Sequence, residues 1–394
     1  MIKFFSWSPS PMPITETNKK VFHLGKHLSC LFFVLLGALL PFNPLCCYAN
    51  DSRIRILVVS SYHPEYDWSQ ETHAGFCDAM FKLGYFDNRD QVAAFSKNNK
   101  VETSKIIIKK EWLDSKRRPG KAGIEERSLK IYKKALAFRP GLVFVGDDNA
   151  AKYIGKLFLD SPVPLIFWGI NMNPLKYDLV ETVHAPGHNI TGVYQRGYYM
   201  ESLAFLKKLV PAAKTFAILS VDTPTGRAHH KAIEQLAGQG KLPIQLVSTV
   251  ATSSFEKWKQ SALALQSKVD AFFLAHYAGL KDSSGNYVKE EDVARWYLTN
   301  IKKPETVGFR HYVEQGMLCG ADDSGYNQGY EAVLIAHDIL AKGAKPAAYP
   351  PRAPKRGPLL LNRHRAETLG IAISKNSGAE QLIETAAALK NTSQ

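Results

Sequence analysis

The stretch RIRILVVS at residues 53–60 decides the fold class. It is an apolar run rich in β-branched residues, which is typical of a strand buried on both faces of a parallel sheet. Residues 68–83 follow, and Phe76, Met80 and Leu83 lie there at the i, i+4 and i+7 spacing of one helix face. The strand and the helix together predict the first unit of an open α/β sheet.

The same alternation of strand and helix continues along the chain in two sets. The first set predicts strands at residues 104–109, 141–145 and 164–168, with helices at 125–138 and 154–159. The second set predicts strands at residues 215–221, 243–250 and 270–277, with helices at 199–210, 228–237 and 255–266. Alternating units of this kind build open parallel sheets with helices on both faces. The sequence therefore predicts an α/β fold with two doubly wound parallel-sheet lobes.

The C-terminal part departs from this alternation. Residues 325–342 predict a helix, and Gly343 follows it at a position where helices favour glycine. The segment 344–358 holds five prolines, which favours an extended crossing. A short strand is expected at 359–362, and a helix near 363–369.

The composition is that of an ordinary globular protein, with 45% hydrophobic and 22% charged residues among 394. Lys and Arg outnumber Asp and Glu by 50 to 36, but this excess of +14 is scattered along the chain. We therefore expect solvated basic faces and no nucleic-acid partner. The five cysteines form no Cys-x-x-Cys pair of the kind that structural zinc sites use. Cys77 and Cys319 form either a disulfide or two small buried side chains.

Residues 28–42 read LSCLFFVLLGALLPF and form the only long apolar run of the sequence. Lysines precede this run and small residues follow it, which is typical of a secretory signal. A membrane span needs about 20 apolar residues, more than this run supplies. We predict a signal peptide at 1–49, cleavage after Ala49, and a mature protein that is periplasmic or otherwise extracytoplasmic. A lipid anchor at Cys46 or Cys47 is the alternative.

Polar and aromatic residues follow the predicted strands. In open parallel sheets, ligands bind at the carboxyl ends of the strands, so these residues are candidate ligand contacts. They are Ser61, Tyr62, Trp68, Asp147, Asp148, Asn149 and Asn171 in the first set, and Asp222, Thr223 and Tyr277 in the second. Such groups suit hydrogen bonding and stacking on a small solute, and the aspartates favour a solute with a cationic group.

The sequence carries no enzyme signature that we recognise. It has no G-x-G-x-x-G or phosphate-binding loop after a strand, and no G-x-S-x-G elbow. Asp147 and Asp148 are adjacent, so they do not form the facing carboxylate pair of a glycosidase, and the alternative is that one caps the following helix. His229 and His230 point about 100° apart on a predicted helix, which favours a solvated surface over a metal site. We predict no catalytic residue, no metal and no cofactor.

Four segments of the chain resemble a known family. They read ILVVSSYHPEYDW at 56–68, VFVGDDNA at 143–150, PVPLIFWGIN at 162–171 and NITGVYQ at 189–195. With the C-terminal helix, crossing and strand, they make the chain similar to ABC-transporter substrate-binding proteins of the type I periplasmic binding protein fold. The similarity is to the tryptophan-binding-like branch of that family and covers about residues 51–375.

The resemblance implies two lobes joined by a hinge of three crossings, near residues 194, 321 and 354. Lobe 1 is then expected to hold residues 50–193 and 322–353, and lobe 2 residues 194–321 and 354–390. The resemblance also adds Gln195 and Asp322 to the candidate ligand contacts, and it implies a small-molecule ligand.

The implied function is capture of a small molecule between the lobes and its delivery to an ABC transporter permease. The SYHP–W opening also occurs in extracytoplasmic sensor regions, so the alternative is a sensor that reports occupancy to a membrane signalling partner. A third hypothesis is an exported hydrolase that uses Asp147 or Asp148, and it alone predicts turnover. The aromatic amino-acid binders of the family favour small hydroxyl residues where this chain has those two aspartates.

Overall fold

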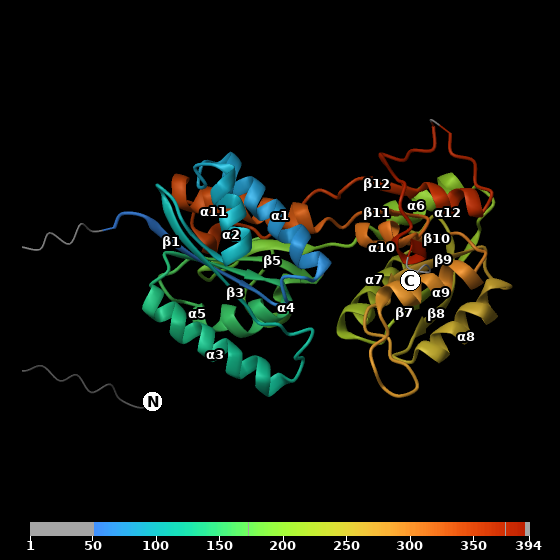
Figure 1. The fold of residues 1–394 in the computed structure, drawn as a ribbon, viewed down its shortest axis with the longest axis horizontal. Coiled ribbons are helices and arrows are strands. Elements are labelled where there is room, and N and C mark those ends of the chain that lie inside the picture. The colour runs from blue at the N-terminus through green and yellow to red at the C-terminus, as the bar shows by residue number, and fades with distance from the viewer. Residues whose placement is uncertain (1–50, 172, 375, 391–394) are drawn as a thin grey trace, which may run out of the picture. The chain divides into compact units, whose positions relative to one another are not determined.

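The computed structural model describes residues 51–171, 173–374 and 376–390, and within them the chain forms two sheets. The strands of the first sheet are β1 (Ile54–Ser60), β2 (Lys100–Glu102), β3 (Ile106–Trp112), β4 (Leu142–Gly146), β5 (Leu165–Asn171) and β6 (Ile190–Gln195). They lie in the order β2-β3-β1-β4-β5-β6, and β2–β3 is the antiparallel pair. We call this sheet with its helices lobe 1 (Figure 1).

Helices cover both faces of the lobe 1 sheet. They are α1 (Asp67–Lys82), α2 (Arg89–Asn98), α3 (Lys121–Phe138), α4 (Asp147–Ala150), α5 (Lys156–Phe158) and α11 (Gly325–Lys342), with a π-helical turn at Ala151–Gly155 and a 3-10 turn at Pro174–Tyr177. Ile56 and Val58 of β1 pack with α1, α2 and α11, whereas Leu57 and Val59 pack with α3 and the π-helical turn. Burial on both faces is the reason that this strand is a continuous apolar run.

The second sheet, with its helices, is lobe 2. Its strands are β7 (Thr215–Ser220), β8 (Gln245–Ala251), β9 (Ala271–His276), β10 (Glu305–Val307), β11 (Cys319–Ala321), β12 (Leu359–Asn362) and β13 (Gln381–Ile383). They lie in the order β13-β12-β11-β10-β9-β7-β8, and β11–β12 is the antiparallel pair.

The lobe 2 sheet is also covered on both faces. Its helices are α6 (Tyr199–Leu209), α7 (Pro224–Gly238), α8 (Phe255–Gln266), α9 (Glu290–Asn300), α10 (Arg310–Gln315), α12 (Arg363–Thr368) and α13 (Ala387–Lys390). Trp258 of α8 and Tyr297 of α9 belong to one buried cluster, and Leu203 of α6 and Ile233 of α7 to another. None of the helices in the described part of the chain combines the length and hydropathy that a membrane span requires.

The predicted α/β fold with two parallel sheets is confirmed. The sequence analysis did not predict the helices α2 and α9, of 10 and 11 residues, and the other differences concern short elements. The strands β10 and β13 have three residues each, too few to carry a readable pattern. The helix predicted at 154–159 is instead the π-helical turn Ala151–Gly155 followed by α5. The predicted signal peptide at 1–49 lies outside the described residues.

The prediction that His229 and His230 lie on a solvated surface is wrong. Both are buried, with 4% and 8% of their surface exposed. Nδ1 of His229 lies 2.6 Å from the Tyr199 hydroxyl, and its ring packs edge-on against Phe309. The helix α7 therefore turns these histidines toward the protein interior, which their polarity alone did not indicate.

The chain passes between the two lobes three times. It does so at residues 196–198 after β6, at 322–324 after β11, and at 353–358 before β12. The last of these follows a 3-10 turn at Pro346–Ala348 and an isolated bridge between Val193 and Arg352. Cys77 and Cys319 are free, and each is buried in the core of a different lobe.

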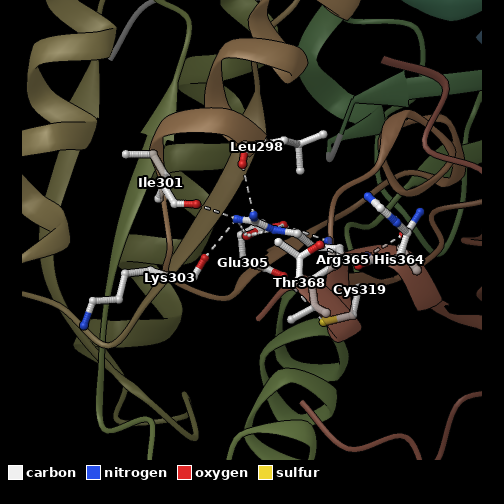
Figure 2. A network of polar contacts seen from close by, with 10 residues as sticks. Leu298, Ile301, Lys303, Glu305, Cys319, His364, Arg365 and Thr368 are labelled. Carbon is white, nitrogen blue, oxygen red and sulfur yellow. Dashed lines mark hydrogen bonds and ion pairs between the residues drawn. The ribbon is translucent and has the colours of Figure 1, made fainter. Parts of the chain in front are cut away.

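Lobe 2 contains a buried ion pair between Arg365 and Glu305 (Figure 2). The guanidinium of Arg365 donates to both carboxylate oxygens of Glu305, with an Nη2–Oε2 distance of 2.9 Å. It also donates to the carbonyl oxygens of Leu298, Ile301 and Lys303. The pair ties α12 to the start of β10 and to the end of α9.

Candidate ligand-binding site

A cavity lies where residues from the carboxyl ends of strands in both lobes meet. Lobe 1 lines it with Tyr62, Tyr66, Trp68, Lys116, Asp147, Asn171 and Gln195, and lobe 2 with Thr225, His276, Phe309 and His311. About 40 Å³ of this cavity is open to water, and one water needs about 10–15 Å³. A solute larger than a few waters therefore requires these side chains, or the lobes, to move apart.

Asp147 supplies a buried carboxyl group to this cavity, with 2% of its surface exposed. It follows β4 directly and has a left-handed backbone with φ of 67°. Its Oδ1 accepts a hydrogen bond of 2.7 Å from Nε1 of Trp68. A Cβ atom at position 169 would lie 2.4 Å from the same oxygen, so Gly169 makes room for the carboxyl group.

Burial raises the pKa of Asp147 to about 8, and the nearby Asp148 charge acts in the same direction. The hydrogen bond from Trp68 and the charges of Lys116 and Lys110 oppose this rise. A buried carboxyl of this kind gains most from a cation that arrives beside it, because the cation replaces the lost hydration of the charged form.

This pKa predicts how the stability of the ligand-free protein changes with pH. The folded protein binds the Asp147 proton more tightly than the unfolded chain does, so this contribution is full below about pH 4. It is lost as the pH rises through about 8. The variant Asp147→Asn should therefore have a melting temperature that falls less than that of wild type between about pH 5 and about pH 8.5.

Thermal melts of both proteins at the two pH values measure this difference. Asp178→Asn, which changes a side chain that is 92% exposed, is the matched control and should follow wild type. An equal pH dependence of wild type and Asp147→Asn would contradict the assignment of a raised pKa to Asp147.

Lys116 is the cation of the same cavity and comes from the loop after β3. Its Nζ lies 5.0 Å from the ring centres of both Tyr62 and Tyr66, whose rings meet edge to face at 5.1 Å. Burial lowers the pKa of Lys116, and the charge of Glu290 at the start of α9 opposes this. Burial also raises the pKa of Glu290 to about 7, against the influence of Lys116. The site thus offers a carboxyl group, an ammonium group and aromatic rings within one small space.

The lobe 2 wall is aromatic and polar. Nδ1 of His276 lies 2.7 Å from the Tyr312 hydroxyl, and His311 stacks on Phe309 with Nδ1 free of a partner among the described residues. Burial lowers the pKa of His276, and it lowers that of His311 to about 3, so both rings are neutral at physiological pH. Phe309 also meets Trp68 of lobe 1 edge to face, with ring centres 5.9 Å apart.

Five of the residues selected from the sequence line this cavity, and three lie just behind it. The lining residues are Tyr62, Trp68, Asp147, Asn171 and Gln195. Ser61 donates to the Gly146 carbonyl, and Asn149 donates to the Ser115 hydroxyl. Asp148 accepts hydrogen bonds from Asn171 and from the Tyr177 hydroxyl, while α4 receives no side-chain cap. Asp148 therefore orients Asn171 and does not itself face the cavity.

The remaining four selected residues do not line the cavity. Asp222 is exposed and pairs with Arg227, and Thr223 caps α7 by accepting from the Gly226 amide at 3.1 Å. Tyr277 is buried against Tyr312, and its hydroxyl donates to Gln315. Asp322 accepts from the Arg310 amide at 3.1 Å, where the chain crosses between the lobes.

Six lining residues escaped the sequence analysis. They are Tyr66, Lys116, Thr225, His276, Phe309 and His311. Tyr66, Lys116 and His276 follow or end strands, so the rule that selected the others also pointed to them. Phe309 and His311 follow β10, which is too short to be recognised in the sequence.

Two α/β sheets joined by three crossings, with a cavity lined from both, are the architecture of the two-lobed periplasmic binding protein fold. A model of the family described as ABC transporter substrate binding protein matches residues 121–383, and the chain belongs to that family. The resemblance found in the sequence is thereby confirmed. Proteins of this family bind a substrate and are not an enzyme class.

Solved structures support the fold. The chain is similar to a domain from Streptococcus pneumonia solved in complex with L-Trp, at 22% identity and a TM-score of 0.61, over 84% of this chain and 100% of that one. It is also similar to the ligand-free, open structure of a substrate binding protein with adhesive properties from Clostridium difficile. There the identity is 19% and the TM-score 0.62, over 84% of this chain and 99% of that one. No curated protein sequence matches the chain.

Proposed function

We propose that this protein is the extracytoplasmic solute-binding component of an ABC transporter, which captures a small molecule between its lobes and delivers it to a permease. Membership of the substrate-binding family supports the class. The observation that carries the proposal is the cavity lined from both lobes, with the buried Asp147 carboxyl in its wall. Closure of the lobes on a solute is the signal that a permease then reads.

The chemistry of the lining groups narrows the ligand. Asp147 favours a cationic group, the rings of Tyr62, Tyr66 and Trp68 favour an apolar or aromatic part, and Lys116 accommodates an anionic group. The similar domain solved with L-Trp binds a solute that carries all three features. We infer a small ammonium-bearing solute. Because the aromatic amino-acid binders of the family favour small hydroxyl residues where this chain has Asp147 and Asp148, aromatic amines are the first compounds to test and amino acids the second.

Replacement of Asp147 tests the ligand assignment. Asp147→Asn keeps the hydrogen bond from Trp68 but removes the charge, so affinity for the solute should fall by about tenfold to a hundredfold. Titration calorimetry with the strongest compound of a thermal-shift screen of amino acids and amines measures this change. Asp222→Asn is the matched control, because Asp222 is exposed and lies outside the cavity, and its affinity should equal that of wild type.

Two outcomes would contradict the proposal. An equal loss of solute affinity in Asp147→Asn and Asp222→Asn would place the cation site elsewhere. Chemical conversion of the solute during the titration would favour the hydrolase hypothesis. Cross-linking of the loaded protein in its host then distinguishes the partners. Capture of a permease supports transport, whereas capture of a membrane signalling protein supports the sensor.

A further inference from the structure

The second crossing between the lobes contains a buried carboxyl group that has no partner. Asp323 lies in the segment 322–324 and is 2% exposed. Its backbone amide donates to the Gly308 carbonyl of lobe 2 at 2.8 Å. Neither of its side-chain oxygens makes a hydrogen bond with a residue that the structure describes. Buried polar groups are nearly always paired, so this carboxyl requires an explanation, and the function proposed above makes no use of it.

The second and third crossings are hydrogen-bonded to each other next to Asp323. The amide of Asp322 donates to the Pro358 carbonyl at 3.2 Å, and the Gly357 amide donates to the Asp322 carbonyl at 2.8 Å. The packing there is close, because a Cβ atom at position 357 would lie 2.3 Å from Oδ2 of Asp322. Asp323 therefore directly follows the point where these two crossings meet.

The first crossing also approaches Asp323. Its Gly197 amide stabilises the charged form of the Asp323 carboxyl, although it makes no hydrogen bond of ordinary geometry with it. At the end of the same crossing, the Tyr198 hydroxyl donates to the Pro354 carbonyl of the third crossing. The three crossings therefore meet around Asp323, and its carboxyl group lies inside the hinge.

Motion of one lobe relative to the other requires torsion changes in these crossings. On either side of them the chain enters hydrogen-bonded sheets, which move as rigid bodies. The lobes are closed in this structure, because Trp68 of lobe 1 packs on Phe309 of lobe 2 and the cavity between them is only about 40 Å³. Opening therefore changes the surroundings of Asp323, which come from two crossings and from Gly308. An ionised carboxylate needs water or donors, and the closed hinge provides no donor with hydrogen-bond geometry.

We propose that Asp323 is a proton switch in the hinge: its protonated carboxyl favours closed lobes, and its ionised carboxylate favours open lobes. The neutral form is buried without a partner at a much lower cost than the charged form. Acid conditions therefore favour retention of the solute, and alkaline conditions favour its release. This consequence for the solute rests on the function proposed above, whereas the movement of the lobes can be measured without a solute.

The pKa of Asp323 defines the pH range of the switch. Burial raises this pKa to about 7, the charge of Asp322 acts in the same direction, and the Gly197 amide opposes the rise. In an open, hydrated hinge the carboxyl titrates near its ordinary value of about 4. The closed form is therefore fully favoured below about pH 4. Its ratio to the open form falls as the pH rises to about 7, by at most about tenfold for each pH unit.

Other titratable groups face this part of the hinge. Burial and the charge of Asp323 raise the pKa values of Tyr198 and Tyr199, so both hydroxyls are neutral. Burial also raises the pKa values of Asp322 and Glu71. The charged groups beyond these are Arg310 and Glu314 of α10, and Arg196, Glu201 and Arg356 near Tyr198. Because several groups titrate in one range, the test must change Asp323 alone.

Small-angle X-ray scattering of the ligand-free protein at about pH 5 and about pH 8 tests the proposal. We expect the radius of gyration of wild type to be larger at the higher pH, because the lobes open. Asp323→Asn and Asp323→Ser both remove the titrating group, and each should show at most about half of this increase. Asp178→Asn, which changes a side chain that is 92% exposed, is the matched control and should expand as wild type does.

Two results would overturn the proposal. The switch does not exist if wild type fails to expand between the two pH values, or if the folded Asp323 variants expand by more than about half as much as wild type. Thermal melts at both pH values establish which variants are folded. Since no solute is present, a negative result refutes the switch and leaves solute binding beside Asp147 unaffected. Conversely, a failure of the solute titrations does not alter the scattering result.

Discussion

Replacing Arg365 by methionine should lower the free energy of unfolding by about 3–5 kcal/mol. The substitution leaves the Glu305 carboxylate, which is fully buried, without its cation (Figure 2). Three backbone carbonyls at the end of α9 and before β10 also lose their donor. An uncompensated buried charge costs much more than the pair itself contributes.

Urea unfolding of the variants followed by circular dichroism measures this loss. Arg363→Met is the matched control, because Arg363 pairs with Glu384 at the surface, where such pairs contribute less than about 1 kcal/mol. The double variant Arg365→Met, Glu305→Leu should recover much of the lost stability. A cost for Arg365→Met no greater than that for Arg363→Met would refute the assigned role of the buried pair.

Gly75→Ala should be the second strongly destabilising change. At this position α1 and α11 pack backbone against backbone, and a Cβ atom would lie 1.8 Å from the Tyr326 carbonyl oxygen. Gly329 makes the reciprocal approach, because a Cβ atom there would lie 2.0 Å from the Thr72 carbonyl oxygen. Neither oxygen can rotate away, so the helices must separate, at a cost of about 1–3 kcal/mol or more.

Gly238→Ala is the matched control for this substitution. A Cβ atom at Gly238, at the end of α7, meets nothing within 4 Å. Alanine there should leave stability unchanged or raise it by up to about 1 kcal/mol, because alanine favours the helix. Equal effects of Gly75→Ala and Gly238→Ala in thermal or urea unfolding would mean that α1 and α11 are not closely packed.

The sequence predicted those parts of the fold that long apolar runs specify. β1 and β5 are buried on both faces, so each is a continuous run whose composition alone identifies a parallel strand. The antiparallel pair β11–β12 joins segments distant in sequence, such as Cys319 and Leu361, which local patterns do not encode, and β2 is a three-residue strand too short to carry a pattern. His229 and His230 show the same limit, because a polar side chain can be buried wherever a partner such as Tyr199 reaches it.

The sequence predicted most of the cavity-lining residues of lobe 1 but none of those of lobe 2. In lobe 1, the strand ends led to Tyr62, Asp147 and Asn171, all of which line the cavity. In lobe 2, the same rule selected Thr223, which caps a helix, and Tyr277, which packs into the core. A residue at a strand end either faces the cavity or packs within its own loop, depending on its rotamer and its neighbours. Both are set by the folded protein and cannot be read from the local sequence.

The central claim is that one small solute binds between the lobes beside Asp147. Native mass spectrometry tests it most directly, on protein exposed to a concentrated small-molecule extract of its host and then desalted. We predict one solute mass per chain in wild type and in Asp222→Asn, and loss of that mass in Asp147→Asn. A bound mass that persists in Asp147→Asn, or that disappears in Asp222→Asn instead, would contradict the account.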